Sequence, residues 1–388
     1  MNDSQPPPKR AAKLFHKKSR TGCQQCRSRR VKCDESKPIC SNCSRLSLPC
    51  VYDRTSSSPR STKPSASSPA NTVVEIPESE SRRRRELRLF YQYITDTGPS
   101  LALDDVSNHF WVTALCRLAL ESDSLLYCMY MITALHTEKR SNFTDLEANE
   151  TCRTYLNMAI HEHHKDLTAM NAKKIEYVCL TSSMLRIHGF ARLQCRPLKP
   201  YTPPIDWLRI TGSSKVLFRQ AWGLVRDTPE SLAHFMIESV SDFLDDNRNE
   251  ELRQDWNHLL SRGKPHELDE PWDSEIEEVY ASALSLIGGT WNGMKNQKHT
   301  TTSVGRRIVV FPMLLPKRFA DFVQELRPRA LVILAHYFAL LSMLHKIWWI
   351  GDSGFRELQA LCQFLPAEWQ SSLEWPKKIL RQQDVTIE

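Results

Sequence analysis

Six of the chain's 12 cysteines lie between Gly22 and Cys50, and their spacing repeats. Clustered thiols in a reducing compartment are metal ligands more often than disulfides. A structural zinc takes four ligands in a tetrahedron, so six thiolates hold two zinc ions only if two of them bridge both metals. The pattern Cys-x2-Cys-x6-Cys occurs twice, with six residues between the copies, at Cys23, Cys26 and Cys33 and then at Cys40, Cys43 and Cys50.

The symmetry of this repeat constrains the bridging pair. Bridging thiols should occupy equivalent positions, and Cys23 and Cys40 are the first cysteines of their copies. A single-zinc ribbon is the alternative, and it would leave two of the six thiols without a metal.

Positive charge is concentrated in only one of the two copies. The six residues after the second cysteine are RSRRVK in the first copy and SRLSLP in the second. We expect each to form a short helix after its Cys-x2-Cys corner. The first run has four cations and the second has one, Arg45. Zinc requires the cysteines of both copies, whereas an anionic partner explains why the cations are concentrated in the first. The alternative is that they only offset the negative charge of the metal cluster; these cations are Arg27, Arg29, Arg30 and Lys32.

Net charge is also distributed unevenly along the whole chain. Residues 1–60 carry a net charge of +10, and the rest of the chain carries −3. A basic end on a near-neutral body favours nucleic acid as the partner, with a merely soluble basic tail as the alternative. Two basic clusters, Lys9-Arg10 and 17–20, precede the cysteines and predict nuclear localisation, further phosphate contacts or both.

The cysteine segment resembles the zinc binuclear cluster (Zn2Cys6) domain of fungal transcription factors. That family has the same two cysteine triplets, a proline in the joining loop, here Pro38, and a basic run after the second cysteine. The resemblance implies two zinc ions, one on Cys23, Cys26, Cys33 and Cys40 and the other on Cys23, Cys40, Cys43 and Cys50.

The resemblance also implies a helix placed in the major groove of double-stranded DNA at a CGG-type site. It assigns base reading to Arg30 with Arg29 beside it, since arginine fits the O6/N7 edge of guanine. Arg27 and Lys32 become mainly phosphate contacts.

Composition divides the chain into four parts. We predict a basic disordered arm over 1–20, the zinc module over 21–53, a Ser/Pro-rich disordered linker over 54–83 and an all-helical domain over 84–388. The stretch RRRRELRLFYQYI after the linker supports at most a heptad and a half, so no zipper is predicted. The protein then binds DNA as a monomer or pairs as a homodimer through its helical domain.

The domain after the linker has the 3.6-residue apolar period of α-helices, which predicts a mostly α fold. The period is clearest over 124–140, 149–170, 173–193 and 328–349. The most apolar run, 330–344, is too short to span a bilayer and predicts a buried core helix, so we expect no membrane span. The amino-terminal 20 residues have no apolar run of the secretory type, which predicts an intracellular protein.

This helical domain is similar to the regulatory domain of fungal zinc-cluster factors, particularly the sterol-uptake-regulator-like group. The resemblance rests on LLYCMYMITALH, PPIDWLRITGSSKVL, RPRALVILAHYFALL and LPAEWQSSLEWP. In the sterol regulators this domain binds a sterol and governs passage into the nucleus, so the resemblance implies a small lipophilic ligand.

Three further features have simpler interpretations. Residues 228–280 carry 15 acidic and four basic residues with interleaved aromatics, which suits an activation segment or, more simply, a solvated amphipathic face. The histidines of HEHHK at 161–165 lack the His-Glu-x-x-His spacing and should be exposed. The remaining cysteines should be buried and structural, with a redox sensor as the alternative; they are Cys116, Cys128, Cys152, Cys179, Cys195 and Cys362.

These patterns predict a nuclear, zinc-dependent, sequence-specific regulator of RNA polymerase II genes, controlling a metabolic or secondary-metabolite gene set. The alternative is a lipid-, sterol- or partner-sensing receptor whose zinc module serves mainly as a DNA tether. No nucleophile elbow, P-loop or dinucleotide-binding motif is present, so an enzyme is not predicted.

Overall fold

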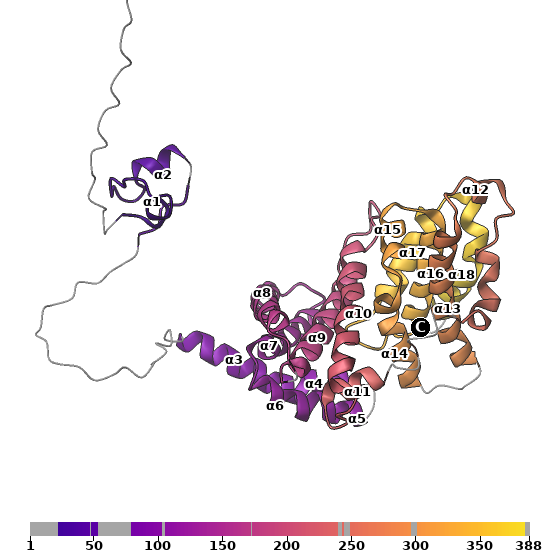
Figure 1. Cartoon of the computed structure of the whole chain (residues 1–388), viewed down its shortest axis with the longest axis horizontal. Coiled ribbons are helices and arrows are strands. Elements are labelled where there is room, and N and C mark those ends of the chain that lie inside the picture. Colours follow the sequence, from indigo (N-terminus) through magenta and orange to yellow (C-terminus); the bar gives the residue numbers. More distant parts are fainter. Residues whose placement is uncertain are drawn as a thin grey trace, which may run out of the picture. The chain divides into compact units, whose positions relative to one another are not determined.

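The computed structural model describes residues 22–46, 48–52, 79–102, 105–171, 173–239, 243, 249–295 and 301–384. The chain divides into two compact units, Met1–Ile76 and Pro77–Glu388. The predicted arm over 1–20 and most of the predicted linker lie outside the described residues. The described residues contain helices and no strand, so the predicted mostly α class is confirmed (Figure 1).

The first unit is built around two short helices, α1 (Gln24–Ser28) and α2 (Ser41–Arg45). Each begins directly after the first cysteine of a copy, and that cysteine is its N-cap residue. The prediction of a helix after each Cys-x2-Cys corner was wrong in position. Each helix contains the corner and ends two residues beyond the second cysteine.

The second unit contains the remaining helices. Its first half comprises α3 (Glu80–Gln92), the π-helix η1 (Tyr93–Thr97), α4 (Gly98–Leu101), α5 (Asp105–His109), the π-helix η2 (Phe110–Ala114), α6 (Leu115–Ala119), α7 (Asp123–Arg140), α8 (Leu146–Thr168) and α9 (Ile175–Leu193). It continues with α10 (Ile205–Val225), α11 (Leu232–Glu238), the 3₁₀ helix η5 (Glu251–Leu259), α12 (Pro265–Leu268), α13 (Ser274–Lys295), α14 (Thr301–Leu314), α15 (Lys317–Gln324), α16 (Pro328–Ser342), α17 (Ser353–Phe364), the 3₁₀ helix η6 (Ala367–Leu373) and α18 (Glu374–Asp384).

Side-chain caps define where several of these helices begin. The Ser122 hydroxyl accepts from the amide of Leu125 at the start of α7, and the Asp145 carboxylate accepts from Ala148 at the start of α8. Such caps satisfy amides that have no partner within the helix. The four predicted helical stretches are all observed, and α3 begins at Glu80, within the range predicted as linker.

Helix α10 connects the two halves of this unit. It packs against α9 and α11 on one side and against α14 and α15 on the other (Figure 1). A close backbone approach in the second half depends on Gly288 of α13, because a β-carbon there would lie 1.9 Å from the carbonyl oxygen of Leu252. η5 can therefore lie directly against α13.

The predicted core helix is α16. Its residues from Arg329 to Ser342 are all buried, and the chain turns after Ser342 rather than continuing to Trp349. Within the part of the chain that the structure describes, no helix is both long and apolar enough to cross a membrane.

The acidic segment contributes to this core. Phe243, Trp256 and Leu259 are each at most 3% exposed and belong to the main apolar cluster. Glu270 pairs with the buried Arg329. These contacts favour the amphipathic interpretation of residues 228–280 over a free activation segment.

Two smaller predictions are corrected in part. His163 of the HEHHK stretch is buried, and its Nε2 lies 3.0 Å from the hydroxyl of Ser182, because that face of α8 packs against α9. Among the six scattered cysteines, Cys195 is exposed and Cys362 is half-buried, whereas the other four are buried as predicted.

Candidate metal centre and nucleic-acid interface

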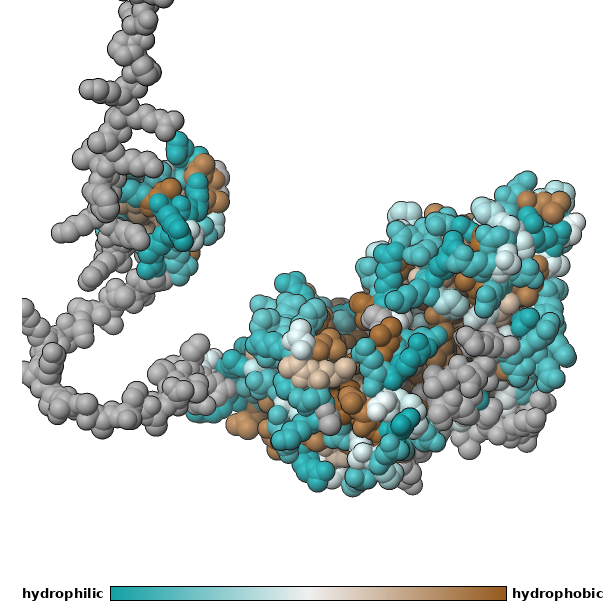
Figure 2. Space-filling model, in the orientation of Figure 1, coloured by the Kyte–Doolittle hydropathy of each residue, from teal (hydrophilic) through white to brown (hydrophobic). Residues whose placement is uncertain are grey.

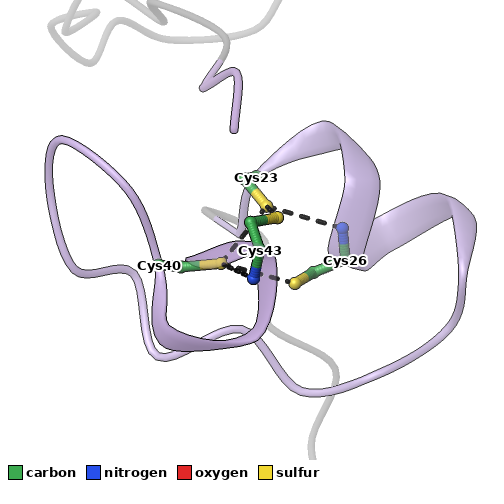
Figure 3. Close-up of side chains that lie close together, drawn as sticks. All are labelled: Cys23, Cys26, Cys40 and Cys43. Atoms are coloured by element: carbon green, nitrogen blue, oxygen red, sulfur yellow. Dashed lines mark hydrogen bonds between the residues drawn. The ribbon is translucent and has the colours of Figure 1, made fainter. Parts of the chain in front are cut away.

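The cysteine side chains of α1 and α2 converge on one point (Figure 3). The sulfurs of Cys23, Cys26, Cys40 and Cys43 all lie within 4.8 Å of one another, and all four residues are buried. The sulfur of Cys23 lies 3.8 Å from that of Cys40 and 3.6 Å from that of Cys43. The Cys26 and Cys40 sulfurs are 3.6 Å apart.

These separations fit zinc rather than disulfides. A tetrahedral zinc with Zn–S bonds of about 2.3 Å keeps its sulfurs roughly 3.8 Å apart. A disulfide would bring two sulfurs to about 2.05 Å. All 12 cysteines are free thiols.

The hydrogen bonds around the sulfurs repeat from one copy to the other. In the first copy the amide of Cys26 donates to the sulfur of Cys23, and the amide of Cys23 donates to the sulfur of Cys33, both at 3.4 Å. In the second copy the Cys43 amide donates to Cys40 at 3.4 Å, and the Cys40 amide donates to Cys50 at 3.3 Å. The two copies therefore make equivalent amide-to-sulfur hydrogen bonds, as their repeated spacing suggested.

Contacts between thiols distinguish two groups. The thiol of Cys26 interacts with those of Cys23, Cys40 and Cys33, and the thiol of Cys43 interacts with those of Cys40, Cys23 and Cys50. Cys23 and Cys40 are common to both groups. This is the arrangement that two metals sharing two thiolates require.

The thiols ionise unequally without metal. Burial opposes ionisation of Cys33, but hydrogen bonds from the amides of Cys23 and Glu35 outweigh it and lower the pKa of Cys33 to about 7. Burial, followed by hydrogen bonds with Cys40 and Cys23, raises the pKa of Cys43 to about 12. Metal binding must therefore displace protons, and zinc supplies the charge that holds these sulfurs as thiolates.

Helix α1 ends in a Schellman motif. The amide of Arg30 donates to the carbonyl of Arg27, and the amide of Val31 donates to the carbonyl of Cys26. Arg30 occupies the position after the cap, with a φ of 56°. This left-handed conformation favours glycine and costs other residues roughly 1–2 kcal/mol. An arginine here therefore has a backbone cost that a glycine would avoid.

The structure places all four predicted DNA-contacting residues on the exposed surface of the first copy. Arg27 lies in the last turn of α1, Arg29 is its C-cap, and Arg30 and Lys32 follow in the turn and the extended loop. Val31, between the last two, is 42% exposed. In the second copy the residues equivalent to Arg27 and Arg29 are Ser44 and Leu46.

Asp34 connects the loop to the start of α2 and was not predicted from the sequence. Its carboxylate accepts from the amide of Ser41 at 3.1 Å and from the hydroxyls of Ser41 and Ser36. These bonds, that from the Ser41 hydroxyl first, lower the pKa of Asp34 to about 2. Tyr52 was also missed; its hydroxyl lies 3.6 Å from the Cys33 sulfur and donates to the carbonyl of Ser36.

Asp34→Asn should speed zinc release at neutral pH, because it removes the negative charge that accepts from the amide of Ser41, the first residue of α2. The depressed pKa makes this contribution fully present above about pH 4, and it is lost only as pH falls toward 2. Zinc release to a chromogenic chelator measures the effect. Glu35→Gln is the control, because it removes one negative charge from the adjacent residue. Equal rates of zinc release in the two variants would contradict a specific role for the bond between Asp34 and Ser41.

Taken together, a bridging-competent thiol cluster, a one-sided cationic surface and a separate helical unit define a zinc-dependent DNA-binding regulator. The sequence profile of the fungal Zn(2)-Cys(6) binuclear cluster domain matches residues 21–59. A Zn(2)-C6 fungal-type transcription factor of Aspergillus fumigatus, afumD, is 32% identical over 347 residues, covering 85% of this chain and 87% of that protein. Another, of Gibberella zeae, is 25% identical and covers 96% of this chain and 87% of its own length.

The chain belongs to the Zn(2)-C6 fungal-type transcription factors. Sterol uptake control protein 2 of Candida albicans is 48% identical over 56 residues, covering 13% of this chain and 8% of that protein. The predicted family resemblance and the predicted binuclear zinc cluster are thus confirmed. The relatives that span the chain are named as transcription factors, in agreement with the prediction that it is not an enzyme.

Proposed function

We propose that this chain reads a CGG-type site in double-stranded DNA through the exposed cations of its first cysteine copy. The observation that carries the proposal is their one-sidedness. The two copies share the same amide-to-sulfur hydrogen bonds, yet the run after the second cysteine has four cations in the first copy and one, Arg45, in the second. A cluster that only needed charge compensation would not require this asymmetry.

In this proposal one zinc is held by Cys23, Cys26, Cys33 and Cys40 and the other by Cys23, Cys40, Cys43 and Cys50. The close contacts of Cys23 and Cys40 with both groups of thiols support it. The zinc ions stabilise the fold, and the protein's own residues make the DNA contacts. Arg30 and Arg29 read bases from the major groove, and Arg27 and Lys32 contact phosphates.

Three base pairs are too few to specify a genomic site. Binding-site selection from random DNA with the full-length, zinc-loaded protein tests the proposal directly. A CGG-type half-site supports it, and two half-sites at fixed spacing would indicate pairing through the helical unit. The absence of any enriched sequence would contradict base reading.

Arg30→Ala should weaken binding to the selected site by about 1–3 kcal/mol and weaken binding to random DNA far less. Arg30→Gly should lose the same DNA affinity while retaining zinc at least as well as wild type, because glycine accepts the left-handed backbone. Fluorescence anisotropy at several salt concentrations measures both affinities. Arg45→Ala, in the second copy, is the matched control, and equal losses on both DNAs would make Arg30 a phosphate contact.

We further propose that the protein acts in the nucleus on RNA polymerase II genes of a metabolic or secondary-metabolite set. The resemblance to fungal zinc-cluster regulators and the basic clusters ahead of the cysteines support this. Transcript profiling after deletion of the gene, with chromatin immunoprecipitation, would identify the set.

A second candidate function is that of a receptor for a small apolar molecule, with the zinc module as the DNA tether. The specific observation that favours it is a cavity in the helical unit whose lining is predominantly apolar.

A further inference from the structure

The cavity lies where several helices of the second unit meet. Its volume is about 170 Å³, and it opens to solvent. Phe110 of η2, Phe218 of α10, Phe235 of α11 and Val309 of α14 contribute to its apolar lining. Figure 2 shows apolar residues reaching the surface of the helical unit near α9, α10 and α11.

One buried cation interrupts this apolar lining. Arg186 of α9 is 8% exposed and lines the cavity. Its Nη2 donates to the hydroxyl of Ser183 at 2.9 Å, and its Nη1 reaches only the thioether sulfur of Met313 at 3.3 Å. Its Nε has no hydrogen-bond partner among the described residues. The ring of Phe218 lies 5.0 Å from the guanidinium carbon.

Within the part of the chain that the structure describes, nothing balances the charge of Arg186. Among the residues that the structure describes, no carboxylate forms an ion pair with it. Burial lowers the pKa of Arg186 to about 10, so the guanidinium stays charged at neutral pH. Another buried arginine of the unit, Arg329, has the carboxylate of Glu270. Buried charges in proteins are normally paired, and an unpaired one is costly.

A ligand with a negatively charged group and an apolar body would complement both the buried guanidinium and the apolar lining. A carboxylate would accept a charge-assisted hydrogen bond from the guanidinium of Arg186, and an apolar body would cover the aromatic and aliphatic lining. A neutral sterol would leave the guanidinium unpaired.

We propose that the helical unit binds a lipophilic carboxylic acid, such as a long-chain fatty acid, with its carboxylate on Arg186. The proposal rests on the second candidate function and narrows it to one class of ligand.

Fluorescence titration of the full-length, zinc-loaded protein with cis-parinaric acid and with its methyl ester tests this assignment. The two probes share one apolar body and differ in charge. Wild type should bind the acid at least about tenfold more tightly than the ester, the range of a charged hydrogen bond. Arg186→Met preserves the bulk of the side chain and removes its charge. The affinity for the acid should therefore fall to that for the ester. Palmitate should displace the probe, and hexadecanol should not.

Val309→Trp fills the cavity and should weaken the binding of both probes. This variant locates the binding site even if Arg186→Met fails to fold. Equal binding of acid and ester by wild type would overturn the carboxylate assignment but leave the receptor function. If neither probe binds, and a neutral fluorescent sterol also fails, the receptor function falls as well. Far-ultraviolet circular dichroism of the same protein sample, which reports the long helices of the second unit, shows that this unit is folded in either case.

Discussion

Cys40→Ser is expected to release both zinc ions and unfold the amino-terminal unit, whereas Cys50→Ser should weaken mainly one zinc. The Cys40 sulfur lies 3.8 Å from that of Cys23 and 3.6 Å from that of Cys26, and it also interacts with Cys43. It therefore contacts both groups of thiols. A structural zinc contributes apparent binding free energy of about 10–16 kcal/mol to a small domain, so losing a shared ligand should have a very large effect.

Native mass spectrometry of the full-length variants measures the zinc count directly. We expect two zinc ions in wild type and in the control Cys195→Ser, whose thiol is exposed in the helical unit. Circular dichroism should show little loss for Cys40→Ser, because the long helices belong to the second unit. A Cys40→Ser protein that retains one zinc at wild-type affinity would refute the bridging assignment.

The metal ligands could be predicted because their spacing is local and their chemistry is specific. The residues that hold the metal ligands in place could not be predicted. Asp34 reaches Ser41 only after the loop folds back, and nothing in DESKPICS marks that contact. The helix was misplaced because the first-copy run RSRRVK contains Arg30, whose left-handed backbone ends the helix early, and helical propensity does not signal such a position in an arginine.

In the helical unit, periodicity located the helices but not the charges inside the core. Apolar spacing predicted α7, α8, α9 and α16 because each buries a continuous face. Arg186 and Arg329 occupy buried positions on two of these helices. Their environment depends on residues far along the chain, as with Met313 beside Arg186, so no local pattern reveals which arginine is paired.

Glu270→Ala should destabilise the helical unit by about 3–5 kcal/mol, because it leaves Arg329 buried without its counterion. The two side chains are 8% and 2% exposed, and Arg329 Nε donates to Glu270 at 2.8 Å. The Arg329 amide also donates to Glu270, at 3.1 Å. The guanidinium carbon lies 5.0 Å from the ring of Trp272 and 5.3 Å from that of Trp369, so tryptophan fluorescence during urea unfolding should report the loss.

The control is a carboxylate of the same acidic segment that forms an exposed pair. Glu275 contacts Arg318 at 2.6 Å, but these side chains are 62% and 46% exposed. Glu275→Ala should therefore cost no more than about 1 kcal/mol. Equal costs for the two variants would show that Arg329 is held by other contacts, of which the carbonyls of Leu259 and Ser261 are the candidates. A much larger loss of stability for Glu270→Ala would show that at least one acidic residue of 228–280 serves the packing of the core.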